Sequence, residues 1–241
     1  MTPATEEDLE IFSSLRGHRC PNGYFIGDGE KAVRRMIEHG CVARLLCSPE
    51  WLDRLPPNLD IRIAPREALD RIAGLKLHQR LMALGRIPDP GPLRGSLLVA
   101  LDGLSNAENV GAILRSCAAF GVEGVLVGPN TLSPWLRRAV RVSMAAGLQV
   151  PVHFTNDLAD TIRPLNAWAA HLYGERTTYT EVDFRGDCCI VFGGEADGPT
   201  PEVLAACRGA VYIPMAPEWD CINVGASAAV ILAEIRRQRA T

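Results

Sequence analysis

The stretch Leu97–Arg115, LLVALDGLSNAENVGAILR, decides the fold class of this 241-residue chain. Residues 97–101 form a continuous apolar run, which is typical of a strand buried on both faces of a parallel sheet. A polar loop follows, and the pattern from Val110 to Phe120 predicts a helix that ends at Gly121. A buried strand that leads directly into a helix indicates an α/β architecture.

The same alternation of strands and helices continues to the end of the chain. The pattern predicts further strands at residues 125–127, 152–154, 167–172, 188–192 and 210–213. It predicts helices at residues 134–146, from Pro201 onward, and at 223–239. Such alternation indicates a mostly parallel sheet that is covered by helices on both faces.

A second α/β layer region precedes this one. The segment 86–96, RIPDPGPLRGS, carries three prolines and two glycines and is typical of an interdomain linker. Before it, the pattern predicts strands at 24–26, 42–47 and 61–64, and helices at 30–39, from Ser48-Pro49 onward, and at 65–72. We therefore expect a small domain over residues 1–90 and a larger one over 96–241.

Composition excludes several protein classes. Apolar residues make up 47% of the chain, charged residues 22%, and the net charge is −3, which excludes disordered, fibrous and wholly basic proteins. No apolar run approaches the ~18–20 residues that cross a bilayer, and the acidic opening MTPATEEDLE is unlike a signal peptide. We expect a soluble cytoplasmic protein.

Eight cysteines are present, without CxxC pairs or the Cys/His spacing of a zinc site, so no metal is expected. Reduced, mostly buried thiols are the expectation for such a chain. The five histidines share no close spacing and are interpreted as structural.

Chemistry is expected in the loops that follow the strands, because open α/β sheets bind ligands beyond the carboxyl ends of their strands. In the first loop, Asn109 is placed to cap the helix, Gly111 allows close approach, and Arg115 follows on the helix. A helix N-terminus with such donors is suited to an anion. The alternative interpretation is that these residues only cap a helix and place an arginine on its exposed surface.

Two more loops stand out. In residues 192–200, FGGEADGPT, adjacent glycines let the backbone face a ligand, and Glu195 can accept hydrogen bonds from a ribose or an amine; a plain turn is the alternative. Residues 213–227 enter a helix through small side chains, with Asn223 as the polar group at its start. No P-loop, GxGxxG, HExxH or GxSxG motif is present, which disfavours phosphate and hydride transfer.

In order and spacing, these three loops resemble the motifs of the SpoU (TrmH-like) branch of the SPOUT RNA methyltransferases. The first motif corresponds to Leu101-Asp102, Asn109, Gly111, Arg115 and Phe120-Gly121. The second corresponds to Gly193, Glu195 and Gly198, and the third to Ile213-Pro214-Met215 with Cys221-Ile222-Asn223-Val224-Gly225. The block Arg141–Ala146 with Pro151-Val152 also resembles the family. Residues 24–33 and 76–79 resemble its N-terminal L30e-like substrate-binding domain.

The resemblance implies a catalytic domain with a deep trefoil knot, which physical reasoning alone would not predict because knots are very rare. It implies a homodimer that uses S-adenosylmethionine, without a metal, to methylate a ribose 2′-hydroxyl of rRNA or tRNA. The separate front domain favours rRNA. The implied cofactor-binding residues are Gly193, Gly194, Ile213, Met215 and Ile222.

The resemblance also implies residue roles. Arg115 would bind the target phosphate and help to remove the 2′-hydroxyl proton, while Asn109, Glu195 and Asn223 would shape the pocket. Cys221 and Gly225 stand where the family has serines, and a thiol is a poorer hydrogen-bond donor than a hydroxyl. Cys221 can still donate a weak hydrogen bond in place of that serine, so it is kept among the catalytic candidates, and a nucleophilic role for it is the less favoured alternative.

Two other functions are compatible with the sequence. One is that of an RNA-binding or ribosome-assembly protein without catalysis, which the changes at Cys221 and Gly225 favour. The other is that of a methyltransferase that acts on a base nitrogen. RNA binding requires local positive charge. Two arginine groups are candidates for such a patch, although solvated surfaces explain them equally well: Arg16, Arg19, Arg34 and Arg35, and Arg137, Arg138 and Arg141.

Overall fold

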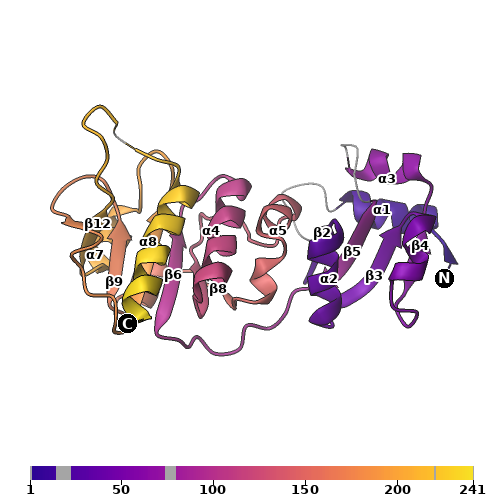
Figure 1. The fold of residues 1–241 in the computed structure, drawn as a ribbon, viewed down its shortest axis with the longest axis horizontal. Coiled ribbons are helices and arrows are strands. Elements are labelled where there is room, and N and C mark those ends of the chain that lie inside the picture. The colour runs from indigo at the N-terminus through magenta and orange to yellow at the C-terminus, as the bar shows by residue number, and fades with distance from the viewer. Residues whose placement is uncertain (1, 15–22, 74–79, 220, 241) are drawn as a thin grey trace. The chain divides into compact units, whose positions relative to one another are not determined.

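A computed structural model describes residues 2–14, 23–73, 80–219 and 221–240 (Figure 1). Arg16, Arg19, Cys20 and the segment 76–79 lie outside the described residues. The chain divides into two compact units, one of Met1–Asp89 with Trp135–Leu148 and one of Pro90–Pro134 with Gln149–Thr241. No helix in the described ranges is long and apolar enough to cross a membrane.

The first unit is built on a mixed five-stranded sheet with the order β1-β4-β3-β5-β2. Its strands are β1 (Thr2–Pro3), β2 (Tyr24–Asp28), β3 (Val42–Cys47), β4 (Ile61–Ile63) and β5 (Leu81–Arg86). β4 pairs in parallel with β1 and β3, whereas β5 runs antiparallel to β2 and β3. Its helices are α1 (Glu6–Ser14), α2 (Glu30–Glu38), η1 (Pro49–Arg54), α3 (Arg66–Ala73), α5 (Arg137–Ser143) and η2 (Ala146–Leu148).

The second unit is a seven-stranded, all-parallel sheet with the order β10-β12-β9-β11-β6-β7-β8. Its strands are β6 (Leu97–Asp102), β7 (Gly124–Val127), β8 (Val152–Phe154), β9 (Ala167–Ala170), β10 (Thr177–Thr178), β11 (Cys188–Gly193) and β12 (Gly209–Tyr212). Its helices are α4 (Ala107–Phe120), α6 (Leu158–Ile162), α7 (Pro201–Ala206) and α8 (Val224–Arg239).

Helices cover both faces of the second sheet. α6 and α7 pack together against Ala100 and Val191, and α4 packs along α8 on the other side, as Figure 1 shows. The central strands β6 and β11 are buried along their whole length, which explains their continuous apolar sequence. The predicted parallel α/β fold is therefore confirmed, while the trefoil knot stays a prediction.

The predicted helix at residues 134–146 is shorter than expected. α5 ends at Ser143, because Met144 and Ala145 adopt left-handed backbone angles with φ of 53° and 58°. This segment packs with the first unit, where the Trp135 ring lies 4.9 Å from that of Phe25. The helix predicted from Ser48-Pro49 is a short 3₁₀ helix, and the sequence patterns missed β1, β5, β10, α1, α6 and η2.

The segment is held in the first unit by a buried ion pair. Arg137 Nε and Nη2 donate to the two oxygens of Asp28 at 2.6 and 3.0 Å. The side chains of Arg137 and Asp28 are 10% and 4% exposed. Because Arg137 is bound internally, it does not belong to an RNA-facing patch.

Asp28→Asn is expected to lower the free energy of unfolding by about 3 kcal/mol, because it leaves the buried Arg137 charge without its counter-charge. Urea unfolding of the full chain measures this change. Glu50→Gln is the matched control and should change stability little, since Glu50 and Arg66 form a solvent-exposed ion pair. Equal losses in the two variants would contradict the burial of the Asp28 pair.

Candidate active site

A cavity of about 420 Å³ lies in the second unit, where β9, β11 and β12 end and α8 begins. Eight of the ten predicted site residues line it: Gly193, Gly194, Glu195, Ile213, Met215, Cys221, Ile222 and Asn223. Parallel strands end at one edge of a sheet, so the loops that follow them meet there. Asn109 and Arg115 are not among the lining residues in the described part of the chain.

The loop after β11 folds back tightly on itself. Gly198 N donates to Gly194 O at 3.0 Å, and Gly198 has a φ of +71°, which favours glycine. A Cβ on Gly193 would lie 2.0 Å from Pro199 N, and one on Gly194 would lie 2.9 Å from Gly103 O. The adjacent glycines are therefore required for the loop to close, and they leave its backbone facing the cavity.

Asp102 holds the C-terminal end of this loop by hydrogen bonds. It is the last residue of β6 and lies opposite Gly193 of β11 in the sheet register. It is 4% exposed. Its Oδ2 accepts hydrogen bonds from Thr200 N at 2.7 Å and from Thr200 Oγ1 at 2.9 Å. The sequence pattern placed Asp102 in the first loop but gave no sign of its bond to the second.

Three polar side chains from the three loops form one chain of hydrogen bonds, which we call the amide relay: Asn223, Asn109 and Glu195. Asn223 Oδ1 accepts from Gly225 N at 2.9 Å, and its Nδ2 donates to Asn109 Oδ1 at 2.9 Å. Asn109 Nδ2 then donates to Glu195 Oε1 at 2.5 Å. Ser105 Oγ donates to the other oxygen of Glu195 at 3.4 Å.

The predicted capping role of Asn109 is wrong. α4 begins three residues earlier than predicted, and the side chain of Asn106 caps it by accepting from Glu108 N at 2.8 Å. Asn109 lies inside the first turn and is 6% exposed, with its amide directed to Asn223 and Glu195. The sequence alone allows either asparagine to cap the helix, and the burial of Asn109 in the folded structure distinguishes the two.

Arg115 does not join the relay. It is exposed, and no hydrogen bond or ion pair to it is found within the described ranges. Six residues along a helix turn the direction by about 120° and advance by about 9 Å, so Arg115 points away from the face that carries Asn109.

One wall of the cavity was missed by sequence reasoning. His171, Leu172 and Tyr173 follow β9 and line the cavity, together with Tyr212. The guanidinium of Arg176 lies 4.8 Å from the Tyr212 ring centroid and also bonds to Leu172 O. Burial, with a smaller effect of Arg176, lowers the pKa of His171. The strand predicted at 167–172 was the available signal for this wall.

Cys221 is the exposed thiol of the described cysteines, whereas Cys47, Cys117, Cys188 and Cys189 are buried. Burial raises the pKa of Cys41, Cys47 and Cys207 to about 11, and that of Cys117 and Cys189 further. These thiols therefore stay protonated near neutral pH, and the buried ones, Cys47, Cys117 and Cys189, act as apolar core side chains. Cys221 lines the cavity, and within the described part of the chain its thiol forms no disulfide.

Comparison with known sequences decides the family. The sequence profile of the SpoU rRNA Methylase family matches residues 96–233, which carry the cavity and the amide relay. The chain belongs to this family.

Three similar proteins illustrate the relationship. The 23S rRNA (guanosine-2′-O-)-methyltransferase RlmB of Xanthomonas axonopodis pv. citri is 35% identical over 198 residues, covering 75% of this chain and 79% of the relative. A crystal structure of an RNA 2′-O ribose methyltransferase is 25% identical with a TM-score of 0.82, covering 100% and 99% of the two chains. AviRb from Streptomyces viridochromogenes in complex with AdoMet is 22% identical with a TM-score of 0.85, covering 99% of each.

Packing explains why Gly225 stands where the SpoU pattern has a serine. A Cβ on Gly225 would lie 2.9 Å from Ala112 Cβ and 3.1 Å from Asn223 Oδ1. Glycine therefore lets α8 approach α4 closely enough for the relay to form. No contact in the structure explains the cysteine at position 221.

Gly193→Ala is expected to lower the free energy of unfolding by at least about 3 kcal/mol, because the new methyl group collides with backbone atoms that cannot move aside cheaply. Urea unfolding measures the loss. Gly186→Ala is the control, since a Cβ there meets nothing within 4 Å, and it should change stability by less than about 0.5 kcal/mol. Tolerance of Gly193→Ala would contradict the tight loop.

Asn109→Asp is expected to cost about 2 kcal/mol at pH 7, because it replaces the donor to Glu195 by a second carboxylate. Facing carboxylates favour proton uptake in the folded state, so the loss shrinks as the pH falls toward 4. Asn106→Asp is the control, since Asp caps helices as well as Asn, and it should be neutral. Unfolding at pH 7 and pH 5 compares the two, and equal effects would refute the assigned direction of the relay.

Proposed function

We propose that this SpoU family member transfers a methyl group from S-adenosylmethionine to a ribose 2′-hydroxyl of RNA. The observation that carries the proposal is the amide relay, which joins side chains from all three family motifs at one cavity. The RlmB relative is named for 2′-O-methylation of guanosine in 23S rRNA, which favours rRNA as the substrate and the cytoplasm as the place of action.

The cavity suits S-adenosylmethionine. Gly193 and Gly194 line the cavity with backbone and no side chain, and Ile213, Met215 and Ile222 supply apolar surface. The volume of about 420 Å³ lies within the range of small-molecule pockets. The bound cofactor supplies an electrophilic methyl group on its sulfonium. AviRb, which shares the fold, contains AdoMet in its structure.

The residues of the chain then have to align the ribose with that methyl group. The amide relay holds Glu195 at the mouth of the loop after β11, where its carboxylate can accept a hydrogen bond from a ribose hydroxyl. Holding the two reactants in line is worth several kcal/mol of the barrier. The relay is therefore assigned to positioning rather than to bond making.

Arg115 is assigned to the target phosphate. Its exposure and its direction away from Asn109 fit a homodimer in which the Arg115 of one subunit serves the cavity of the other. A free guanidinium is a poor base, so removal of the 2′-hydroxyl proton by Arg115 needs the phosphate or a neighbouring group.

Arg115→Ala is expected to reduce methyl transfer at least 100-fold while the affinity for S-adenosylmethionine stays within about twofold. The assay follows labelled methyl from S-adenosylmethionine into total RNA from cells that lack this gene. Digestion of the product to nucleosides locates the methyl group on the sugar or on a base. Retained turnover in Arg115→Ala would refute its role.

A mixing experiment tests the shared site. Glu195→Ala removes the relay's end, and Arg115→Ala removes the phosphate contact. In a mixed dimer of the two variants one of the two sites is intact, so random mixing restores about a quarter of the wild-type activity. No restoration would place both residues in the same subunit's site.

The exposed Cys221 in place of the family serine favours one other function, that of an RNA-binding protein without catalysis. In that case the cofactor binds and no methyl group is transferred to any RNA fraction. Cys221→Ser, which restores the family hydroxyl, would then be expected to restore turnover.

A further inference from the structure

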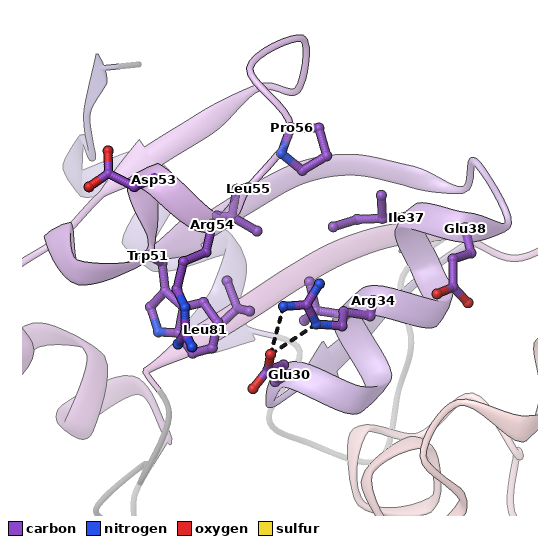
Figure 2. Close-up of a pocket in the computed structure, with 11 residues that line it drawn as sticks. Glu30, Arg34, Ile37, Glu38, Trp51, Asp53, Arg54, Leu55, Pro56 and Leu81 are labelled. Atoms are coloured by element: carbon purple, nitrogen blue, oxygen red, sulfur yellow. Dashed lines mark hydrogen bonds and ion pairs between the residues drawn. The ribbon is translucent and has the colours of Figure 1, made fainter.

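The first unit holds a second cavity, of about 310 Å³, which the proposed reaction does not use (Figure 2). One wall is a single face of α2, from Glu30, Arg34 and Ile37 at helical spacing. The opposite wall is η1 and the residues after it, Trp51 to Pro56. The lining residues all belong to the first unit.

Each wall carries one arginine whose guanidinium group is held in place by a neighbouring side chain. The Arg54 guanidinium lies 5.0 Å from the ring centroid of Trp51, which is 5% exposed. Figure 2 shows Arg54 alongside Trp51, with the Arg34–Glu30 pair on the other side of the cavity. Arg34 Nε and Nη2 donate to Glu30 Oε1 at 2.9 and 2.7 Å.

The remaining lining selects for a flat ring with polar edges. Val33, Ile37, Leu55, Pro56 and Leu81 give the cavity apolar walls, and the carboxylates of Glu38 and Asp53 add acceptors. With three acidic and two basic residues the lining is net negative, which disfavours a free phosphate. The amino group of a nucleobase is a donor that these carboxylates can accept.

We infer that this cavity takes one unpaired base of a bound RNA strand, stacked on the Arg54 guanidinium. Single-stranded RNA is recognised by stacking its bases on aromatic rings and on arginine planes. Trp51 lies behind Arg54, and the contact between its ring and the guanidinium holds the cation in place. A volume at the lower end of the small-molecule range suits one ring system. The inference rests on the proposed function, because that function supplies the RNA.

The test uses the full chain and fluorescence anisotropy with a fluorescein-labelled 12-nucleotide oligocytidine. Its counterpart is an abasic ribose–phosphate strand of the same length. Arg54→Ala is expected to weaken binding of oligocytidine about tenfold, because it removes the plane on which the base stacks. Arg54→Lys should lose nearly as much, because lysine keeps the charge but not the plane.

Arg66→Ala is the matched control, because Arg66 is an exposed, ion-paired arginine of the same unit outside the cavity. It should weaken oligocytidine less than threefold, and the abasic strand should respond alike to Arg54→Ala and Arg66→Ala. Arg54 is exposed, so its variants should melt as the wild type does.

Three results would overturn the inference: equal loss in Arg54→Ala and Arg66→Ala, full affinity in Arg54→Lys, or equal wild-type affinity for oligocytidine and the abasic strand. Methyl transfer is measured separately with total RNA. Its absence, with base-dependent binding intact, would refute the proposed enzyme and leave the cavity assignment standing.

Discussion

The hydrogen bond from Gly225 N to Asn223 Oδ1 fixes the direction of the hydrogen bonds in the amide relay. An amide side chain offers acceptors at its oxygen and donors at its nitrogen. With the oxygen of Asn223 taken by the helix N-terminus, its nitrogen must donate to Asn109. The oxygen of Asn109 is then taken in turn, and its nitrogen must donate to Glu195. The start of α8 thereby sets how the carboxylate is held.

This relay depends on close backbone packing. Gly225 lets α8 lie against Ala112 of α4, and Gly193 and Gly194 let the loop after β11 fold back far enough for Glu195 to meet Asn109. Asp102 holds the other end of that loop through Thr200. Each contact joins two segments that are far apart in sequence, so the site exists only when the whole parallel sheet is formed.

Sequence patterns were sufficient for the parallel sheet and for most of the cavity. Buried runs such as Leu97–Leu101 have few structural alternatives, and loops after parallel strands must meet at one edge. The roles of Asn106 and Asn109 were not separable, because an asparagine near a helix start suits a cap whether it is exposed or buried. Burial against Glu195 depends on tertiary packing that the local pattern does not contain.

The segment 135–148 was unpredictable for a related reason. Its helical pattern is clear, but its place in the first unit rests on the pairing of Arg137 with Asp28 and of Trp135 with Phe25. Nothing in the spacing of one segment indicates which distant partner it will find. Likewise, the wall formed by His171 and Tyr173 comes from a strand whose loop has no motif of its own.

The arginines of this chain differ in whether folding buries the guanidinium or leaves it at the surface, and this difference decides which of them can bind RNA. RNA is a polyanion, and this chain has a net charge of −3, so binding must use local cations rather than the overall charge. Arg137 and Arg239 donate to groups inside the protein and hold segments together. Arg115, Arg34 and Arg54 are exposed. Counting arginines in the sequence cannot separate these groups, because an arginine becomes available to RNA only where folding leaves its guanidinium at the surface.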